Sequence, residues 1–259
     1  MVIYSAKEIK ILHAGGRLLA QVLMEITAMV RPGVTTAELD ACAEARIREL
    51  GGIPSFLGYR GNLSTTPFPS TLCASINGEV VHAPAVPSRT LKKGDIIGLD
   101  IGMRYPARSG LCTDMAVTVG VGTISSEAVK LIHVTKEALR LGISQAKAGA
   151  RVRDIGAVIQ QHVESAGYSV VKDLTGHGVG REVHEDPEIP NFVINGSIGE
   201  RRLASGMVIA IEPMVNIGTP TVKTKSDNWT VTTSDQSLSA HFEHTIAITN
   251  NGPLILTLL

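Results

Sequence analysis

Cysteine and surplus charge are scarce in this sequence, and each shortage narrows the classes of protein that fit it. The three cysteines, Cys42, Cys73 and Cys112, are widely spaced and make no CxxC motif. An odd number without that motif argues against a disulfide framework or a thiolate zinc site, and reduced thiols fit a cytoplasmic protein best. Lysine plus arginine and aspartate plus glutamate are 24 each, so no basic excess predicts a specific nucleic-acid partner.

Long apolar runs are missing as well. No stretch approaches the ~18 apolar residues of a membrane span, and the first residues lack the basic-then-apolar pattern of a signal peptide. Hydrophobic residues nevertheless make up 44% of the chain and charged residues 19%, which is typical of a globular protein. The 259 residues suffice for one large domain or two small halves around a packed core.

Capping boxes and glycine stops predict the helices. Ser5–Glu8 and Thr35–Glu38 have the pattern in which a hydroxyl and a glutamate three residues later cap each other's backbone. The glycines at 33, 51, 149 and 167 mark helix ends. Helices are therefore expected from Ser5 to Arg31, Thr35 to Leu50, Ser125 to about Ala146, and about Val152 to Ala166.

Strand patterns fill the remainder. Residues 53–75 carry Phe56, Tyr59 and Phe68 in a proline- and glycine-rich loop, which either lines a pocket or covers a satellite core. An Asn-Gly turn within residues 75–82 predicts a hairpin that delivers His82. Residues 102–111 are expected to form a turn, and strands are expected at 93–100, 114–119, 205–213 and 238–249.

The two halves of the chain resemble each other. Pro32–Leu39 matches Ala148–Ile155, Gly94–Asp100 matches Gly206–Glu212, and Asp114–Val119 matches Glu243–Ile248. Each half is two helices followed by strands, which predicts a duplicated α+β fold with a pseudo-twofold axis. We expect one domain over residues 1–259, with halves of approximately 1–120 and 121–259.

The repeat brings four carboxylates towards that axis: Asp100, Asp114, Glu212 and Glu243. Buried ionised groups cost several kcal/mol each when they lack a partner, so these carboxylates need cations. The alternative is that each pairs with its own arginine or lysine. The strand contexts of Asp100, Glu212 and Glu243 are apolar and offer no adjacent basic partner.

Histidines complete the candidate site. His177 lies in the run Gly-His-Gly-Val-Gly, which suits neither helix nor strand and leaves its ring uncrowded. The alternative is a solvated histidine in a flexible turn. With the four carboxylates, His177 makes an oxygen-rich set suited to two divalent first-row ions. His82 and His184 remain free to donate hydrogen bonds to a substrate, so the set predicts metal-assisted amide hydrolysis.

The chain resembles the type I methionine aminopeptidases over nearly its whole length. The matching stretches are Ile76–His82, Gly176–Pro187, Ala210–Asn216, Trp229–Val231 and Ser237–Thr245. The resemblance implies the pita-bread fold, in which two related halves pack helices on a curved, mostly antiparallel sheet. It also implies removal of the amino-terminal methionine from nascent proteins and peptides, preferentially when the second residue is small.

The resemblance further implies a role for each site residue. Asp100 would bind one of two divalent ions (Co, Mn, Fe or Zn), His177 and Glu212 the other, and Asp114 and Glu243 both. Glu212 would accept a proton from the attacking water, while His82 faces the scissile nitrogen and His184 the substrate carbonyl. The methionine side chain would contact Tyr59, Phe68, Cys73 and Trp229, and a monovalent cation would bind at Asn77 and Ser239.

The same resemblance implies the protein's surroundings. We expect a cytoplasmic monomer that acts on nascent polypeptides, associates transiently with the ribosome and contacts neither membrane nor specific nucleic acid. His13, His133 and His162 are expected to be surface or packing groups. His241 and His244 flank Glu243, and strand alternation points His244 away from it.

Three departures from the family pattern affect these expectations. Asp100 and Asp114 are further apart than is usual, so the hairpin Met103–Leu111 carries extra residues, which a longer turn absorbs without changing strand register. Residues 60–67 are also stretched. Phe56, Arg60 and Val183 replace other residue types, which affects pocket shape rather than metal chemistry.

Two competing functions fit the same fold. An Xaa-Pro aminopeptidase or prolidase normally carries an additional amino-terminal domain, which this sequence does not show. A non-catalytic binding protein on this scaffold would have lost metal ligands, whereas all five are present here.

Overall fold

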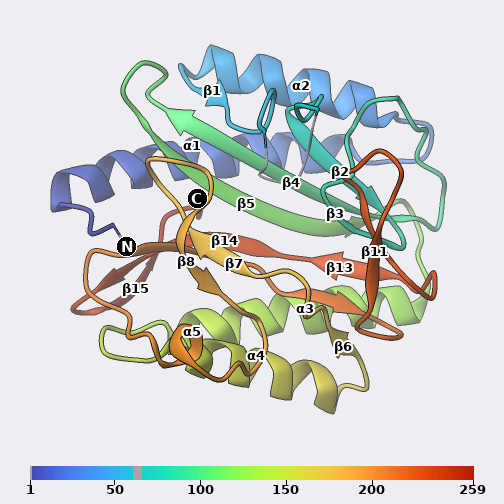
Figure 1. The fold of residues 1–259 in the computed structure, drawn as a ribbon. Helices are drawn as coiled ribbons and strands as arrows, with labels where there is room; N and C mark the ends of the chain where they lie inside the picture. The colour runs from blue at the N-terminus through green and yellow to red at the C-terminus, as the bar shows by residue number, and fades with distance from the viewer. Residues whose placement is uncertain (1, 61–65) are drawn as a thin grey trace.

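The computed structural model describes residues 2–60 and 66–259, so the prediction for residues 60–67 lies mostly outside the described part. A curved sheet runs through the middle of the molecule, with one pair of helices along each side (Figure 1). The first pair is α1 (Ala6–Met29) and α2 (Thr36–Glu49), and the second is α3 (Ser126–Gln145) and α4 (Val152–Ser165). A short helix, α5 (Ser197–Glu200), packs beside α4.

The four predicted helices are confirmed with nearly the predicted ends. Ser5 with Glu8 and Thr35 with Glu38 form complete capping boxes, and the Ser125 side chain caps α3. Each hydroxyl satisfies a backbone N–H that has no partner within the helix. None of the helices in the described ranges has the length and apolar character needed to cross a membrane.

The main sheet has nine strands, and all of its recorded pairings are antiparallel. Its order is β1 (Ile53–Pro54), β4 (Ile96–Tyr105), β5 (Leu111–Gly120), β14 (Glu243–Thr249), β9 (Val208–Ile211), β7 (Gly176–Gly178) and β8 (Glu185–Ile189). Two more strands lie off this path: β2 (Leu72–Ile76) pairs with β4, and β15 (Gly252–Ile255) pairs with β14.

Two small sheets cover one end of the main sheet. The first contains β13 (Ser239–His241), β10 (Met214–Asn216) and β6 (Ser169–Val170). The second contains β11 (Val222–Thr224), β12 (Val231–Thr233) and β3 (Glu79–Val81).

The strand order reflects the internal repeat. The matched segments Gly94–Asp100 and Gly206–Glu212 lie in β4 and β9, and the other matched pair lies in β5 and β14. The order β4-β5-β14-β9 therefore places equivalent strands symmetrically about the junction of β5 with β14. Separate hydrophobic cores lie beneath α1–α2 and α3–α4, so each half buries its own helix pair.

The predicted hairpin at residues 75–82 is confirmed as a chain reversal, and its arms meet at their base, where Ala74 N donates to the Ala83 carbonyl at 2.7 Å and Cys73 bridges Pro84. The Asn77-Gly78 turn forms, but β2 pairs with β4 whereas β3 pairs with β12 in a different sheet. Turn residues predict where a chain reverses, but the partner of each strand depends on which distant edge is free to accept it.

The predicted turn at residues 102–111 is present but shorter than predicted, because β4 continues to Tyr105 and β5 begins at Leu111. The ladder is continuous from Ile96–Gly120 to Tyr105–Leu111, which confirms that the extra residues leave the register intact. Gly102 does not break the strand, since its missing side chain makes room for a ring: a Cβ there would lie 2.7 Å from Phe56 Cε1.

The predicted final strand at residues 238–249 is interrupted at Phe242. Residues before this point form β13 in a small sheet, and residues after it form β14 in the main sheet. The chain therefore changes sheets immediately before Glu243.

Candidate active site

The predicted metal ligands come from adjacent strands at the centre of the main sheet. Asp100 lies on β4, Asp114 on β5, Glu243 on β14 and His177 on β7, while Glu212 directly follows β9. The four carboxylates are buried, and all five side chains line one cavity. Ligand atoms of Asp114, His177 and Glu243 lie within 4.8 Å of one another.

The backbone orients His177 towards the carboxylates. Its Nδ1 lies 2.9 Å from the Gly178 carbonyl and donates to it, so Nε2 points into the site, 3.2 Å from Glu212 Oε1. Burial lowers the pKa of His177, but contact with Glu212 outweighs burial, and the net pKa is raised. The Gly178 contact fixes the ring nitrogen that faces a cation.

Three of the carboxylates are buried close to one another, which disfavours their ionised forms when no cation is bound. Burial, followed by repulsion from neighbouring carboxylates, raises the pKa of Asp114 and of Glu243 well above the usual range. Burial also raises the pKa of Asp100, to about 6. Asp100 Oδ1, Asp114 Oδ1 and Glu243 Oε1 are buried and have no hydrogen-bond partner among the described residues. Oxygen atoms in this condition fit divalent cations, which supply the missing partner.

Glu212 differs from the other three carboxylates because two imidazoles adjoin it. Burial alone would raise the pKa of Glu212, but His177 and His241 outweigh burial and hold that pKa well below its usual value. Glu212 therefore stays ionised at neutral pH and is able to accept a proton.

His82 follows β3 and lies against this cluster. Its backbone φ of 58° is uncommon for a residue with a side chain. Burial lowers the pKa of His82 to about 4, and the neighbouring imidazoles add to the effect of burial. The ring is therefore neutral at pH 7 and keeps one N–H donor.

His184 lies between Tyr59 and His177. Its Nδ1 is 2.8 Å from the Tyr59 hydroxyl, and its ring centroid is 4.4 Å from that of His177. Burial and the adjacent His177 lower the pKa of His184 to about 3. Both histidines predicted to bind substrate are thus neutral groups that line the same cavity.

The residues of the predicted side-chain pocket line the same cavity. Phe68 contacts Trp229 edge-on at 5.2 Å between centroids, and Tyr59 and Cys73 complete the wall. Burial and the nearby Asp100 carboxylate raise the pKa of the Cys73 thiol well above its usual range, so Cys73 is a neutral wall residue. Phe56 both lines the cavity and packs into a satellite core, so both alternatives for the aromatic loop hold.

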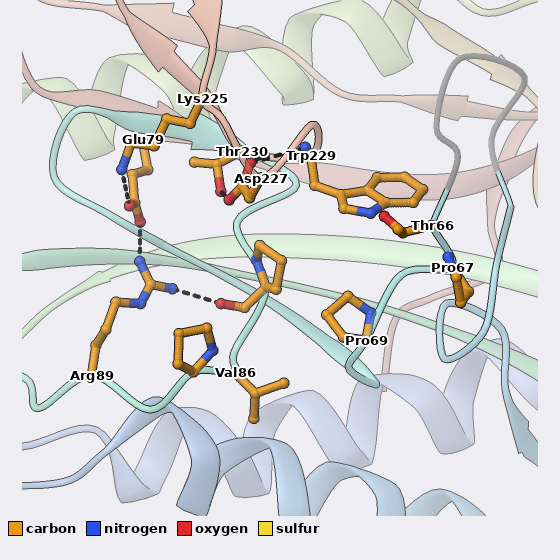
Figure 2. A pocket seen from close by; sticks show the side chains of 12 residues that line it. Thr66, Pro67, Pro69, Glu79, Val86, Arg89, Lys225, Asp227, Trp229 and Thr230 are labelled. Atoms are coloured by element: carbon orange, nitrogen blue, oxygen red, sulfur yellow. Dashed lines mark hydrogen bonds and ion pairs between the residues drawn. The ribbon is translucent and has the colours of Figure 1, made fainter.

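Glu79, which sequence reasoning missed, lies between Arg89 and Lys225 (Figure 2). Its carboxylate accepts from Ile76 N at 2.8 Å and from Lys225 Nζ at 2.7 Å. It also accepts from Arg89 Nη1 at 2.5 Å. The network fixes the turn before His82 to the loop before Trp229, along a proline-lined cavity of about 510 Å³. No sequence pattern indicated Glu79, because its charged partners lie 10 and 146 positions away.

His241 is a second residue that sequence reasoning left without a role. Its Nε2 lies 3.6 Å from Glu212 Oε2. The Thr118 hydroxyl accepts from His241 N at 2.9 Å and donates to its carbonyl at 2.8 Å. The spacing of two from Glu243 was an available signal. His244 points away as predicted, with Nδ1 2.9 Å from Thr257 Oγ1.

The residues predicted to bind a monovalent cation are adjacent. Ser239 N donates to the Asn77 carbonyl at 3.0 Å. The Asn77 side chain donates to Asp95 at 2.9 Å and accepts from Ile96 N at 3.0 Å, and the Ser239 hydroxyl donates to Val215 O at 3.2 Å. These side chains thus already have partners within the chain. Arg60 is exposed and Val183 buried.

Comparison with known proteins identifies the protein family to which the chain belongs. The family described as metallopeptidase family M24 matches residues 10–250. The chain belongs to metallopeptidase family M24, and this membership together with the Asp114–His177–Glu243 cluster supports the use of a divalent metal.

The similar proteins within that family are more specific. Methionine aminopeptidase of Clostridium acetobutylicum is 47% identical over 259 residues, which cover 100% of this chain and 99% of the relative. Methionine aminopeptidase 1 of Bacillus subtilis is 47% identical over 97% of this chain and 96% of its own length. The crystal structure of methionine aminopeptidase from Thermotoga maritima matches with a TM-score of 0.92 at 39% identity, covering 100% of both chains.

These comparisons confirm the predicted resemblance and the pita-bread fold. Xaa-Pro dipeptidase of Bacillus anthracis shares the fold, with a TM-score of 0.77, but its sequence identity to this chain is only 23%. The match covers 99% of this chain and 62% of that protein. The Xaa-Pro alternative is therefore not favoured.

Proposed function

We propose that this chain is a methionyl aminopeptidase that removes the amino-terminal methionine from peptides and nascent proteins, preferentially when the second residue is small. The observation that carries the proposal is one cavity that joins the carboxylate–histidine cluster to an aromatic pocket. The names of its relatives, methionine aminopeptidases at 41–48% identity, support the same activity.

The donor set suits two divalent ions. Asp100 would hold one ion, His177 and Glu212 would hold the other, and Asp114 and Glu243 would serve both. The carboxylate oxygens without partners and the single oriented imidazole support this assignment. When bound, such ions polarise a carbonyl and lower the pKa of water. Oxygen ligands with one imidazole admit Co, Mn, Fe or Zn.

The chain's own side chains bind and orient the peptide. The wall formed by Tyr59, Phe68, Cys73 and Trp229 encloses an unbranched apolar side chain, and a methionine sulfur makes favourable contacts with aromatic rings. Glu212, ionised at neutral pH, takes the proton of the attacking water. His82 donates its N–H to the scissile nitrogen, and His184 donates to the substrate carbonyl.

Metal-dependent turnover of two peptides tests the function. The protein is stripped with chelator and assayed on Met-Ala-Ser and on an Ala-Pro peptide, with Co, Mn, Fe or Zn added back singly. We expect hydrolysis of Met-Ala-Ser only, and only with metal present. Cleavage of the Ala-Pro peptide instead would identify an Xaa-Pro peptidase, and no cleavage with any metal would identify a binding protein.

Replacement of a bridging carboxylate tests the ligand assignment. Asp114→Asn keeps the shape of the side chain but removes its charge, so we expect hydrolysis to be abolished and fewer than two ions to bind. The circular dichroism spectrum should match that of the wild-type protein. Full activity of Asp114→Asn would refute the bridging role.

Four finer features complete the proposal. The nine-stranded sheet takes strands from both halves, which supports a single domain over residues 1–259. The adjacency of Asn77 and Ser239 supports a monovalent-cation site there. The three free cysteines support a cytoplasmic location. Action on new chains favours transient association with the ribosome.

A further inference from the structure

Hydrogen bonds from other parts of the chain hold the segment that carries His184. Residues 180–185, here called the His184 loop, comprise consecutive bends at 180–184 and the first residue of β8. Inside the loop, Gly180 N donates to Glu182 O at 3.0 Å and Glu182 N donates to Glu185 Oε1 at 2.9 Å. Surface bends of this kind open easily unless other parts of the chain fix them.

The long β4–β5 hairpin fixes one side of the His184 loop. Cys112 N donates to the Gly180 carbonyl at 2.6 Å, and Arg104 Nη2 donates to the Arg181 carbonyl at 2.8 Å. Arg104 Nη1 also donates to Gly110 O at 3.1 Å, which holds the guanidinium over its own hairpin. Arg104 and Cys112 are directly opposite in the ladder, beyond the two aspartates. The far end of this hairpin therefore presents two donors, Cys112 N and the Arg104 guanidinium, to the His184 loop.

The amino-terminal segment fixes the other side. The Tyr4 hydroxyl donates to the Glu185 carboxylate, whose two oxygens both lie at 3.0 Å, and accepts from Arg181 N at 2.9 Å. Tyr4 is only 3% exposed, and its own N–H donates to Gly206 O at 2.8 Å. A Cβ on Gly180 would lie 2.2 Å from the Tyr4 hydroxyl, so the loop backbone packs directly on the phenol.

We propose that Arg104 and Tyr4 are positioning residues for His184, which clamp the His184 loop from opposite sides so that the imidazole stays aligned between Tyr59 and His177. The proposal rests on the proposed function, in which His184 donates to the substrate carbonyl. It assigns a role to the far end of the β4–β5 hairpin: the two strands that carry Asp100 and Asp114 continue to Arg104 and Cys112, which contact the loop. Small displacements of an aligned donor reduce turnover strongly, whereas metal binding is unaffected.

Hydrogen exchange tests the clamp without any need for activity. Arg104→Gln shortens the donor, Tyr4→Phe removes only the hydroxyl, and Arg108→Gln is the matched control because Arg108 is exposed in the turn of the same hairpin. We expect residues 180–185 to exchange at least about tenfold faster in the first two variants and at the wild-type rate in the control. Wild-type protection in both Arg104→Gln and Tyr4→Phe would overturn the clamp.

Kinetics in two backgrounds test the consequence for His184. With metal-loaded protein and Met-Ala-Ser, Arg104→Gln and Tyr4→Phe should each lower kcat about tenfold, with unchanged metal stoichiometry. In a His184→Ala background neither change should matter by more than about twofold, because a positioning residue acts only through the group it positions. An equal loss in both backgrounds would show a general structural role and overturn the proposal. An inactive wild-type protein would refute the proposed function, while the exchange measurement would still decide the clamp.

Discussion

Asp114 and Glu243 are protonated in the metal-free site over a wider pH range than free carboxyl groups, because burial and mutual repulsion raise the pKa of each. Asp100 behaves in the same way, with a pKa of about 6. Metal binding requires ionised ligands, so it must expel these protons, and a group that loses a proton on binding makes affinity rise with pH. At the residue scale, these carboxyl groups therefore bind protons in the metal-free site and release them when a cation binds.

The raised pKa values of these carboxyl groups predict the pH dependence of metal affinity. We expect Mn(II) to bind more tightly at pH 8 than at pH 6 and to release protons, since Asp100, Asp114 and Glu243 all have raised pKa values. Calorimetry in two buffers with different ionisation enthalpies counts the protons. Asp114→Asn should release fewer. Affinity that is constant between these pH values would show that the carboxylates are already ionised in the metal-free protein.

Sequence reasoning brought together the residues whose positions follow from the repeat and the motifs, but not those defined by contacts across strands. Asp100 and Glu212 occupy matched places in the two halves, so their convergence followed from the symmetry. Glu79 and His241 could not be assigned roles, because each depends on which distant strand lies opposite.

At the scale of the element, β4 combines three tasks in ten residues. It carries Asp100 at its centre, packs Gly102 against Phe56, and presents Arg104 at its end. Local signals predicted the helices well because caps lie within the helix ends. They failed at Gly102, where glycine reflects close packing against a ring rather than a turn.

The close approach of Gly102 to Phe56 predicts a pocket variant. In Gly102→Ala the new Cβ would lie 2.7 Å from the Phe56 ring, so this ring, which lines the candidate cavity, must shift. We expect a loss of ~1–3 kcal/mol in the free energy of unfolding and a roughly tenfold lower kcat/KM for Met-Ala-Ser. Denaturant titration and steady-state kinetics measure these effects.

The matched control lies on the same strand. A Cβ on Gly98 would have its nearest neighbours at 3.7 Å, an ordinary contact. Gly98→Ala should therefore keep both stability and kcat/KM close to wild type. If Gly102→Ala behaved like Gly98→Ala, Phe56 would not define the pocket.

At the scale of the whole molecule, the candidate ligands join the two halves. Asp100 and Asp114 come from the first half, and His177, Glu212 and Glu243 from the second. Between β5 and β14 the ladder is short, with the pairs Ala116–Glu243 and Met115–His244. The Thr245 hydroxyl adds a hydrogen bond to the Asp114 carbonyl at 2.7 Å.

Metal removal should therefore loosen this junction more than either core. We expect chelator to lower the melting temperature and to speed hydrogen exchange in the centres of β5 and β14, while α1 exchanges at an unchanged rate. Mass spectrometry of peptic fragments resolves these segments. Equal acceleration in α1 would show that the metal stabilises the chain as a whole rather than the junction.

The mirrored order of β4, β5, β14 and β9 has a consequence for the origin of the protein. A half-length ancestor that associated as a symmetric pair would have brought the same two acidic side chains from each copy to its axis. Fusion of two such genes would then have released the copies from identity. One half was free to acquire the imidazole of His177, and the other the hairpin end that contacts the loop carrying His184.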